Sequence, residues 1–270
     1  MLALYRNHMG NDLEVVNDAR ISFAKQASVD IWETITVPDT DAGYNSQVSV
    51  PLIGERDRSL IQFLARGCMK GDWDKLVDAL DIDHTGVPFS RDDIENILAH
   101  VKKIPTHWTP FAQQVVKLRM KAPVPIRTQC FKCKSGFVEN EESRRYSCST
   151  PALFIPEFRS APEGNIKQGS GGIHPDNENL KKQYGMRCRQ QIDFYEELIA
   201  NGVAPEQALF VLPQGVFVNW VWTGSLYAFA EVYNKRADRS HSQGEVADIA
   251  DAISPIMHTL FPVSWAALTE

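Results

Sequence analysis

The segment Gln113–Lys121 (QQVVKLRMK) restricts the possible folds more than any other stretch, because its apolar residues alternate along the chain. Val116, Leu118 and Met120 fall on one side of an extended backbone, and the cationic residues fall on the other. Successive side chains of a strand point to opposite faces of a sheet. The pattern therefore predicts a strand with one buried face. A second strand is expected much later in the chain, around residues 210–218.

Most other apolar residues recur at helical spacing. They predict helices within residues 60–64, 73–80, 94–101 (opened by a Ser90-x-x-Asp93 capping box), 192–199, 226–233 and 246–260. Strands and helices do not alternate regularly, and the sequence holds no glycine-rich dinucleotide fingerprint, so a Rossmann dehydrogenase is disfavoured. Few strands and many helices predict the α+β class.

Size and composition fit a globular chain. Its 270 residues are 43% hydrophobic, enough to bury a full core as one large domain or two small ones. No apolar run approaches the roughly 18 to 20 residues that a membrane-spanning helix needs, and the N-terminus lacks the apolar stretch of a signal peptide. We therefore expect a cytoplasmic protein.

The overall charge limits the class of partner. The formal net charge is −6, so a broad nucleic-acid interface is not expected. A small anion can still bind where basic residues gather locally, because one phosphate needs only a few well-aimed donors.

The cysteine pattern favours free thiols over a disulfide framework, because the number is odd and no secretion signal is present. The five residues are Cys68, Cys130, Cys133, Cys148 and Cys188. Cys130 and Cys133 have the CxxC spacing of a zinc knuckle or a redox pair. No second CxxC or nearby histidine pair completes a tetrahedral set, so no metal is expected.

One stretch, Arg127–Tyr146, gathers five cations, three acids and several hydroxyl and amide groups on an otherwise acidic chain. A solvated charged loop is the simple interpretation. Ser143 beside Arg144 and Arg145 instead suits a phosphate dianion, since a hydroxyl and guanidinium forks can all donate to it. A second cluster at Asn234–Gln243 repeats the mixture. Together the two clusters favour a polyphosphate or nucleotide site.

Several segments match one known family in the same order. They are Gly10-Asn-Asp-Leu with Ala19-Arg-Ile-Ser-Phe, Glu55–Ile61, His107-Trp-Thr-Pro-Phe, Thr128-Gln-Cys-Phe-Lys-Cys-Lys with Asn140-Glu-Glu-Ser-Arg-Arg-Tyr, Arg236–Gln243 and Phe261-Pro-x-Ser-Trp. In these segments the chain resembles the flavin-dependent thymidylate synthases, whose signature is basic-His-basic, a spacer and Asn-Glu-x-Ser-x-Arg-Tyr. The resemblance covers nearly the whole chain as a single domain, 1–270, with additional sequence at about 68–104 and 160–178.

The resemblance implies a fold and an activity. The fold would be α+β, with an antiparallel or mixed sheet flanked by helices. The reaction would be reductive methylation of dUMP to dTMP, with methylenetetrahydrofolate as carbon donor, FAD as hydride carrier and NADPH as reductant. Family members are homotetramers with sites where subunits meet, and they use no cysteine nucleophile.

The resemblance also implies roles for individual residues. Arg236 would be catalytic, because its permanent charge favours the ionised N3 form of the uracil ring and pushes electron density toward C5. Residues that match dUMP contacts are Gln129, Lys132, Glu141, Ser143, Arg144, Arg145 and Arg236. Residues that match FAD contacts are Ser22, His107, Lys132, Cys133, Lys134, Glu141, Ser225, Leu226, Tyr227 and Glu231.

The chain departs from the family pattern in three places. Lys132-Cys133-Lys134 replaces the basic-His-basic core, as in a variant group that includes viral sequences, for which the host cytoplasm would be the location. Leu209 replaces an arginine that reaches the nucleotide phosphate, and Arg144 is expected to compensate. Glu231 stands where an amide or a cation is usual.

Two alternatives remain open. One is a related one-carbon transfer that leaves a hydroxymethyl group at C5 of a pyrimidine nucleotide. The other is a degenerate flavin- or nucleotide-binding homologue without turnover.

Overall fold

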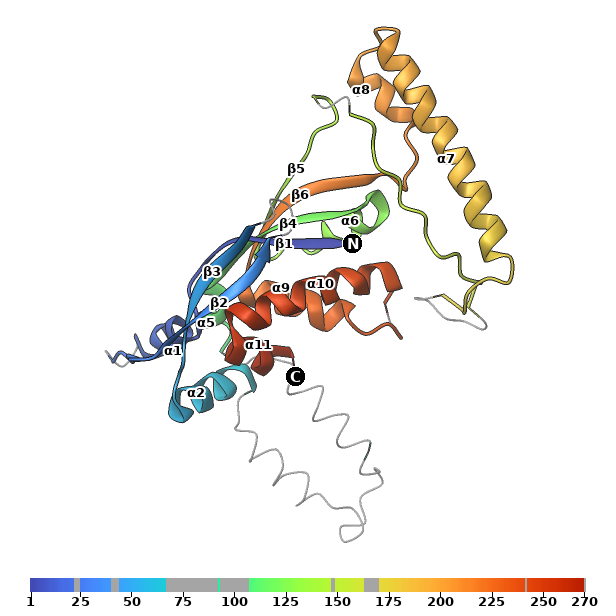
Figure 1. The fold of residues 1–270 in the computed structure, drawn as a ribbon. Coiled ribbons are helices and arrows are strands. Elements are labelled where there is room, and N and C mark those ends of the chain that lie inside the picture. The colour runs from blue at the N-terminus through green and yellow to red at the C-terminus, as the bar shows by residue number, and fades with distance from the viewer. Residues whose placement is uncertain are drawn as a thin grey trace. The chain divides into compact units, whose positions relative to one another are not determined.

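The structure is a computed structural model that describes residues 1–21, 25–39, 44–66, 92, 107–146, 149–162, 170–240 and 242–269. Its elements, in chain order, are β1 (Leu2–Met9), α1 (Asp12–Arg20), β2 (Trp32–Asp39), β3 (Tyr44–Pro51), α2 (Glu55–Arg66), α5 (Thr109–Gln113), β4 (Val115–Pro123), α6 (Val124–Cys130), β5 (Phe137–Glu141), α7 (Asn177–Ala200), α8 (Pro205–Ala208), the 3₁₀ helix η3 (Leu209–Val211), β6 (Phe217–Ser225), α9 (Leu226–Arg236), α10 (Gly244–Leu260) and α11 (Pro262–Thr269). Strands and helices are mixed without regular alternation, so the predicted α+β class is confirmed (Figure 1).

A four-stranded sheet with the order β1-β4-β6-β5 carries the longest apolar strands. The predicted strand at 113–121 is confirmed as β4, and Val116, Leu118 and Met120 are fully buried. The second predicted strand, around 210–218, was placed too early. Residues 209–211 form η3, and Pro213 and Gly215 precede β6. Trp220 and Trp222 of β6 are buried, as alternation in a half-covered strand requires.

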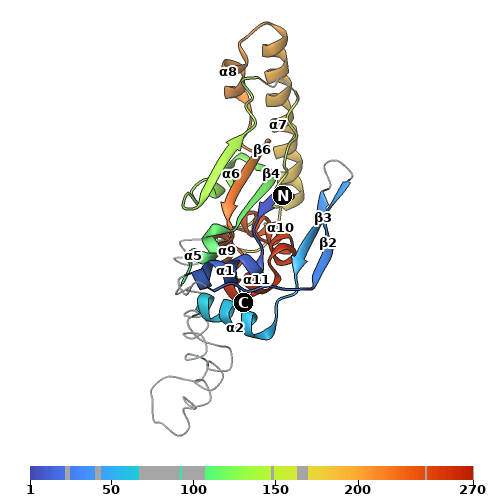
Figure 2. The ribbon, with the colours of Figure 1, turned by 90° about the vertical axis from the view of Figure 1, so that its left-hand side faces the viewer.

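The sequence did not predict β2 and β3, which form an antiparallel hairpin (Figure 2). Its register pairs Trp32 with Pro51 and Asp39 with Tyr44. Val37, Val48 and Val50 are buried, whereas Trp32 is 47% exposed.

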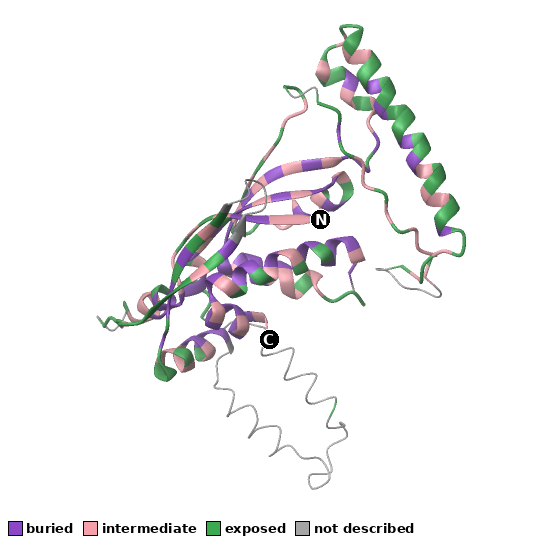
Figure 3. Ribbon diagram, viewed as in Figure 1, coloured by how far each residue is buried: buried purple, intermediate pink, exposed green. Residues whose placement is uncertain are grey.

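The chain divides into two compact units. Unit 1 comprises Met1–Leu4, Leu118–Thr223 and Lys235–Ala252, and unit 2 comprises Tyr5–Lys117, Gly224–Asn234 and Ile253–Glu270. In unit 1, α8 and η3 pack against α7 (Figure 1). Helix α7 is exposed along most of its length and buries few side chains, among them Cys188, Ile192 and Tyr195 (Figure 3). Whether the two units act as one domain stays a prediction.

In unit 2, α11 packs against α1 and α2. The buried carboxylate of Asp12, at the start of α1, accepts backbone hydrogen bonds from Val263 (2.9 Å) and Ser264 (3.0 Å) at the start of α11. Those N–H groups have no partner within their own helix. Asp12 therefore caps a helix that lies at the other end of the sequence.

The expected helices at 60–64, 192–199, 226–233 and 246–260 are confirmed within α2, α7, α9 and α10. The helices expected at 73–80 and 94–101 lie outside the described residues, as does almost all of the 68–104 segment. Within the polar stretch 160–178 the structure describes residues 160–162 and 170–178, where the backbone of Ile173 forms an isolated antiparallel β-bridge with that of Arg159 and α7 begins at Asn177. No helix among the residues that the structure describes is long and apolar enough to cross a membrane.

Candidate functional site

A cavity of about 450 Å³ in unit 1 opens beside the segment that follows β5. Small-molecule sites have volumes of roughly 300 to 1,000 Å³. Its lining residues come from α6, β5, η3 and the approach to β6, and are Val124, Glu141, Glu142, Ser143, Arg144, Arg145, Leu209, Leu212, Pro213, Gln214, Val216 and Val218. Four residues predicted to contact dUMP, from Glu141 to Arg145, therefore share one cavity.

The end of β5 is held in place by Asn219 of the neighbouring strand β6. The backbone N–H of Glu142 donates to the Asn219 carbonyl (2.9 Å), and the Asn219 amide donates to the Glu142 carboxylate (2.7 Å). These two hydrogen bonds fix the chain immediately before Ser143. The hydroxyl and the two arginines that follow are thus presented from a supported turn, which Tyr146 closes by donating to the Ser143 carbonyl (3.1 Å).

Both arginines of the turn have partners in the protein. Arg144 donates to the backbone carbonyl of Ser149 (2.8 Å). Arg145 pairs with Glu206 of α8 (3.2 Å), and both of these side chains are more than half exposed. An exposed ion pair of this kind is weak, so a phosphate dianion can compete with Glu206 for Arg145.

Leu209 lines the same cavity as Ser143, Arg144 and Arg145. The departure seen in the sequence therefore falls at the predicted phosphate site, where an apolar side chain replaces a cation. Leu212 and Pro213 extend this apolar wall.

The ion pair between Arg127 and Glu141 joins α6 to the end of β5. Arg127 Nε lies 3.0 Å from Glu141 Oε2, and about a quarter of each side chain is exposed. Burial raises the pKa of Glu141, and the charge of Arg127 opposes that rise. In the sequence, Arg127 was one of the five cations of the segment Arg127–Tyr146, but no role at the site was predicted for it.

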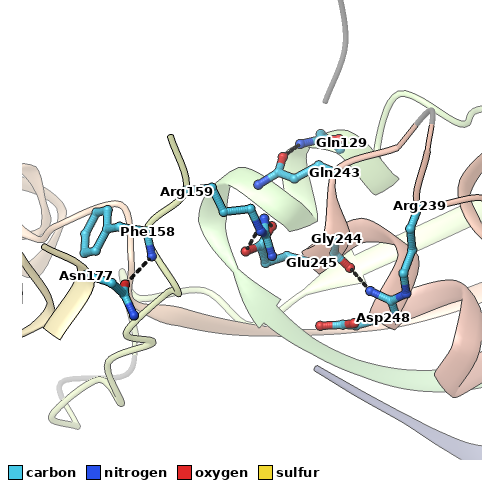
Figure 4. Close-up of polar contacts among 9 residues, drawn as sticks. All are labelled: Gln129, Phe158, Arg159, Asn177, Arg239, Gln243, Gly244, Glu245 and Asp248. Carbon is cyan, nitrogen blue, oxygen red and sulfur yellow. Dashed lines mark hydrogen bonds and ion pairs between the residues drawn. The ribbon is translucent and has the colours of Figure 1, made fainter. Parts of the chain in front are cut away.

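Helix α6 also connects the two polar clusters that the sequence singled out. Gln129 donates from its amide to Gln243 Oε1 at 2.7 Å (Figure 4). Arg236, the last residue of α9, lies close enough to Cys130 for its charge to lower the pKa of that thiol. The basic stretch around residues 127–134 and the segment 236–243 are therefore neighbours in unit 1.

The segment between α9 and α10 is anchored at several points (Figure 4). Arg239 donates to the carbonyl of Gly244 (3.1 Å) and pairs with Asp248 (2.9 Å). Arg159 pairs with Glu245 at 3.1 Å. These contacts hold the chain between Arg236 and α10, and Gln243 with it.

The predicted flavin residues are divided between the units. Those in unit 1 lie on or near the turn after α6, where Lys132 and Lys134 are exposed on either side of the half-buried Cys133. Lys134 pairs with Glu139. Two cations on one exposed turn suit the pyrophosphate of FAD.

Unit 2 holds the other predicted flavin residues. The rings of Tyr227 and Trp108 lie 5.6 Å apart, and His107 stacks on Phe63 at 6.0 Å. Ser225 accepts the backbone N–H of Ala228 (3.1 Å) and so supports the start of α9.

Leu226 is fully buried, and its backbone N–H donates to the Gln114 carbonyl (2.8 Å). Glu231 is half-buried within α9. Ser22 and His241 lie outside the described residues. The roles of all these residues stay predictions.

Within the described ranges, no group of three or more histidine, cysteine, aspartate or glutamate side chains is placed to hold a metal ion. The structure adds residues that the sequence did not assign to the site, namely Arg127, Glu142, Glu206, Leu212, Pro213, Gln214 and Asn219. Most are far from the signature in sequence, so no local motif could identify them.

Comparisons with known proteins place the chain among thymidylate-forming enzymes. A family profile described as "Thymidylate synthase complementing protein" (Thy1) matches residues 52–263. A flavin-dependent thymidylate synthase of Thermus thermophilus is 31% identical over 207 residues, which are 74% of this chain and 73% of that protein. The flavin-dependent thymidylate synthase of Kosmotoga olearia is 30% identical over 166 residues, 60% of this chain and 70% of the relative.

Solved structures show the same fold. The UMP/dUMP methylase PolB from Streptomyces cacaoi, bound with 5-Br UMP, superposes with a TM-score of 0.68 at 19% identity. The superposition covers 99% of this chain and 92% of the methylase chain. The same methylase bound with 5-Br dUMP gives a TM-score of 0.66 at 20% identity.

Proposed function

This chain belongs to the Thy1 family of flavin-dependent thymidylate synthases, and from that premise we propose that it catalyses the reductive methylation of dUMP to dTMP. The observation that carries the proposal is the cavity in unit 1, which gathers Glu141, Ser143, Arg144 and Arg145 around a volume that suits a small ligand. Methylenetetrahydrofolate is the proposed carbon donor and NADPH the proposed reductant.

The cavity suits the phosphate of dUMP at the turn that carries Ser143. The Ser143 hydroxyl and the guanidinium groups of Arg144 and Arg145 supply charge-assisted donors. Arg145 would exchange its exposed partner Glu206 for the phosphate. The apolar wall at Leu209 offers no hydrogen bond, so the two arginines carry the electrostatic attraction.

Arg236 is the proposed catalytic residue. Its guanidinium remains charged at any physiological pH, so it stabilises negative charge that develops on the uracil ring when C5 becomes nucleophilic. The anchored segment between Arg236 and α10 limits its movement. A preorganised charge needs no costly rearrangement at the moment of reaction.

The residues of the α6 turn fit FAD, and FAD, when bound, supplies the hydride that reduces the transferred one-carbon unit. Lys132 and Lys134 would hold its anionic pyrophosphate, and Cys133 would lie against it between them. Glu141, held by Arg127, would keep a carboxylate between the nucleotide and the flavin. Ser22, His107, Ser225, Leu226, Tyr227 and Glu231 are further proposed flavin contacts.

We propose a homotetramer with sites completed between subunits. The resemblance supports this assembly, as do the apolar side chains of Met186 and Phe194, which are 54% and 47% exposed on α7. A mass measured in solution by light scattering tests it, and a monomer at micromolar concentration would contradict it.

The experiment that tests the proposed function follows the product by mass. The purified chain, supplied with FAD, NADPH, methylenetetrahydrofolate and dUMP, should form dTMP. A hydroxymethyl product would favour the related C5 transfer, and flavin binding without product would favour a homologue lacking turnover. Parallel reactions with UMP would show whether the sugar is discriminated.

A further inference from the structure

Cys130 at the end of α6 and Cys133 just after it are held in a tight turn, and neither thiol is a nucleophile in the proposed reaction. The backbone N–H of Cys133 donates to the carbonyl of Cys130 at 2.9 Å, and Lys132 donates to Gln129 at 3.2 Å. A turn closed by a hydrogen bond between its first and fourth residues brings their Cα atoms within about 7 Å. Disulfides span Cα separations of about 4.4 to 6.8 Å, so the backbone already suits one.

Phe131, one of the two residues between the cysteines, is packed on several sides. The Phe131 ring packs edge-on against Trp220 of β6, with 5.8 Å between ring centroids. The guanidinium of Arg127 and the ammonium of Lys134 lie over the same ring, at 5.1 and 5.3 Å from its centroid. These contacts of Phe131 help to hold the turn that joins the two cysteines.

The two thiols differ in access. Cys133 is half-buried, whereas Cys130 is buried, with 4% exposed. Lys132 and Lys134 flank Cys133 and are both exposed. The thiolate is the form of a cysteine that attacks a disulfide. In the chain without bound FAD, a reagent from solution therefore meets Cys133 before Cys130.

We propose that Cys130 and Cys133 are a redox-modification site that closes to an intramolecular disulfide when the protein meets a low-molecular-weight disulfide. The Cys133 thiolate attacks one sulfur of the reagent, the reagent's S–S bond breaks, and one thiolate leaves with the electron pair. The Cys130 thiolate then attacks the Cys133 sulfur and expels the second. The two cysteine protons end on the two released thiols, so the reagent is reduced as the protein is oxidised.

The surroundings of Cys130 support this order. The pKa of Cys130 is raised to about 12, chiefly by burial and also by the charge of Cys133, while the charge of Arg236 opposes both. Once Cys133 is in a mixed disulfide it carries no charge, so its contribution disappears while that of Arg236 remains. The first step therefore makes Cys130 a better nucleophile for the second.

The experiment uses the full chain in buffers of varied ratio of reduced to oxidised glutathione, quenched with an alkylating reagent. Trypsin cleaves after Arg127, Lys132 and Lys134, which puts the two cysteines on separate peptides, 128–132 and 133–134. Oxidation should join these peptides, with no alkyl group on either. The inference does not depend on the proposed function, because the readout is a covalent bond.

Three variants separate the steps. Cys130→Ser should accumulate glutathione on Cys133, since no second thiol displaces it. Cys133→Ser should leave Cys130 alkylated only after unfolding, and Cys188→Ser, which changes a buried cysteine of α7, should leave the joined peptides unchanged.

Alkylation of both Cys130 and Cys133 at every glutathione ratio in the unaltered chain would overturn the proposal. Joining of either cysteine to another residue would also overturn it.

Discussion

Arg127 Nε lies 3.0 Å from Glu141 Oε2, yet its N–H is not aligned to donate a hydrogen bond to that oxygen, so the contact is an ion pair. The pair lies between the cavity, which Glu141 lines, and the turn that carries the predicted flavin residues. Arg127 also covers the Phe131 ring. One side chain therefore sets the charge of a proposed active-site acid and the packing of the turn beside it.

The substitution Arg127→Gln should raise the pKa of Glu141 further, because burial would then act without an opposing charge. The acidic limb of the pH profile of kcat/KM should move to higher pH, since Glu141 would lose its proton later. Arg127→Lys keeps the charge and should largely restore the profile. An unchanged limb in Arg127→Gln would show that Glu141 ionisation does not govern the rate.

Replacement of Arg236 with alanine should reduce kcat by about 100-fold or more, the order of loss seen when one preorganised donor is removed. Flavin absorbance and the unfolding temperature should change little. A suitable control is Arg189→Ala, which removes an exposed arginine from α7. Near-normal turnover in Arg236→Ala would refute its assignment as the activating residue.

Arg144 is the residue proposed to hold the dUMP phosphate where Leu209 offers no cation. Arg144→Ala should weaken dUMP binding about 10- to 150-fold, which corresponds to the roughly 1.5 to 3 kcal/mol of a charged hydrogen bond. Adding Leu209→Arg should recover part of the affinity, because residue 209 lines the same cavity. Titration of dUMP against the flavin absorbance measures both variants.

For the same titration, Arg187→Ala provides a matched loss of an exposed arginine on α7. If Arg144→Ala bound dUMP as tightly as that control, Arg144 would not compensate for Leu209.

Asp12→Ala should lower the free energy of unfolding by about 1 to 3 kcal/mol, because two buried N–H groups at the start of α11 would lose their acceptor. Chemical denaturation of the two proteins measures the difference. Asp12→Asn, which keeps one acceptor oxygen, should lose less than Asp12→Ala.

The stability of the chain should also depend on pH through Asp12. Burial raises the pKa of Asp12, although the hydrogen bonds from Val263 and Ser264 and the charge of Arg58 oppose the rise. The folded state therefore holds the proton more tightly than the unfolded state. This contribution to stability is complete below the unfolded pKa and disappears as the pH rises through the folded pKa. Asp12→Asn should lack that part of the pH dependence.

The sequence predicted the elements whose apolar pattern matches their burial. In β4, Val116, Leu118 and Met120 occupy alternate positions and are all fully buried, so the two-residue period of the apolar positions predicted the strand. Strand β5, at the edge of the sheet, has no buried residue and was interpreted as part of a charged loop. The strand expected around residues 210–218 began too early, because residues 209–211 form a 3₁₀ helix and periodicity alone does not separate a short apolar strand from a helical turn.

The sequence singled out Ser143–Arg145 because they are contiguous and chemically distinctive, and the structure places them in the lining of one cavity. The opposite side of their cavity was not predicted, because Leu212 and Gln214 are apolar or neutral and lie some way along the chain. The resemblance predicted that position 209 lies near the nucleotide phosphate, and the structure places Leu209 in the lining of that cavity. The Gln129–Gln243 hydrogen bond joins residues 114 positions apart.

The cap that Asp12 provides has a consequence for the order in which the protein folds during its synthesis. Its carboxylate and the Val263 N–H are separated by 251 positions, close to the full length of the chain. Asp12 is therefore synthesised 251 residues before Val263. During synthesis the carboxylate of Asp12 lacks these two hydrogen-bond donors until α11 has been made, and a chain that stops before α11 cannot bury that carboxylate with its native partners.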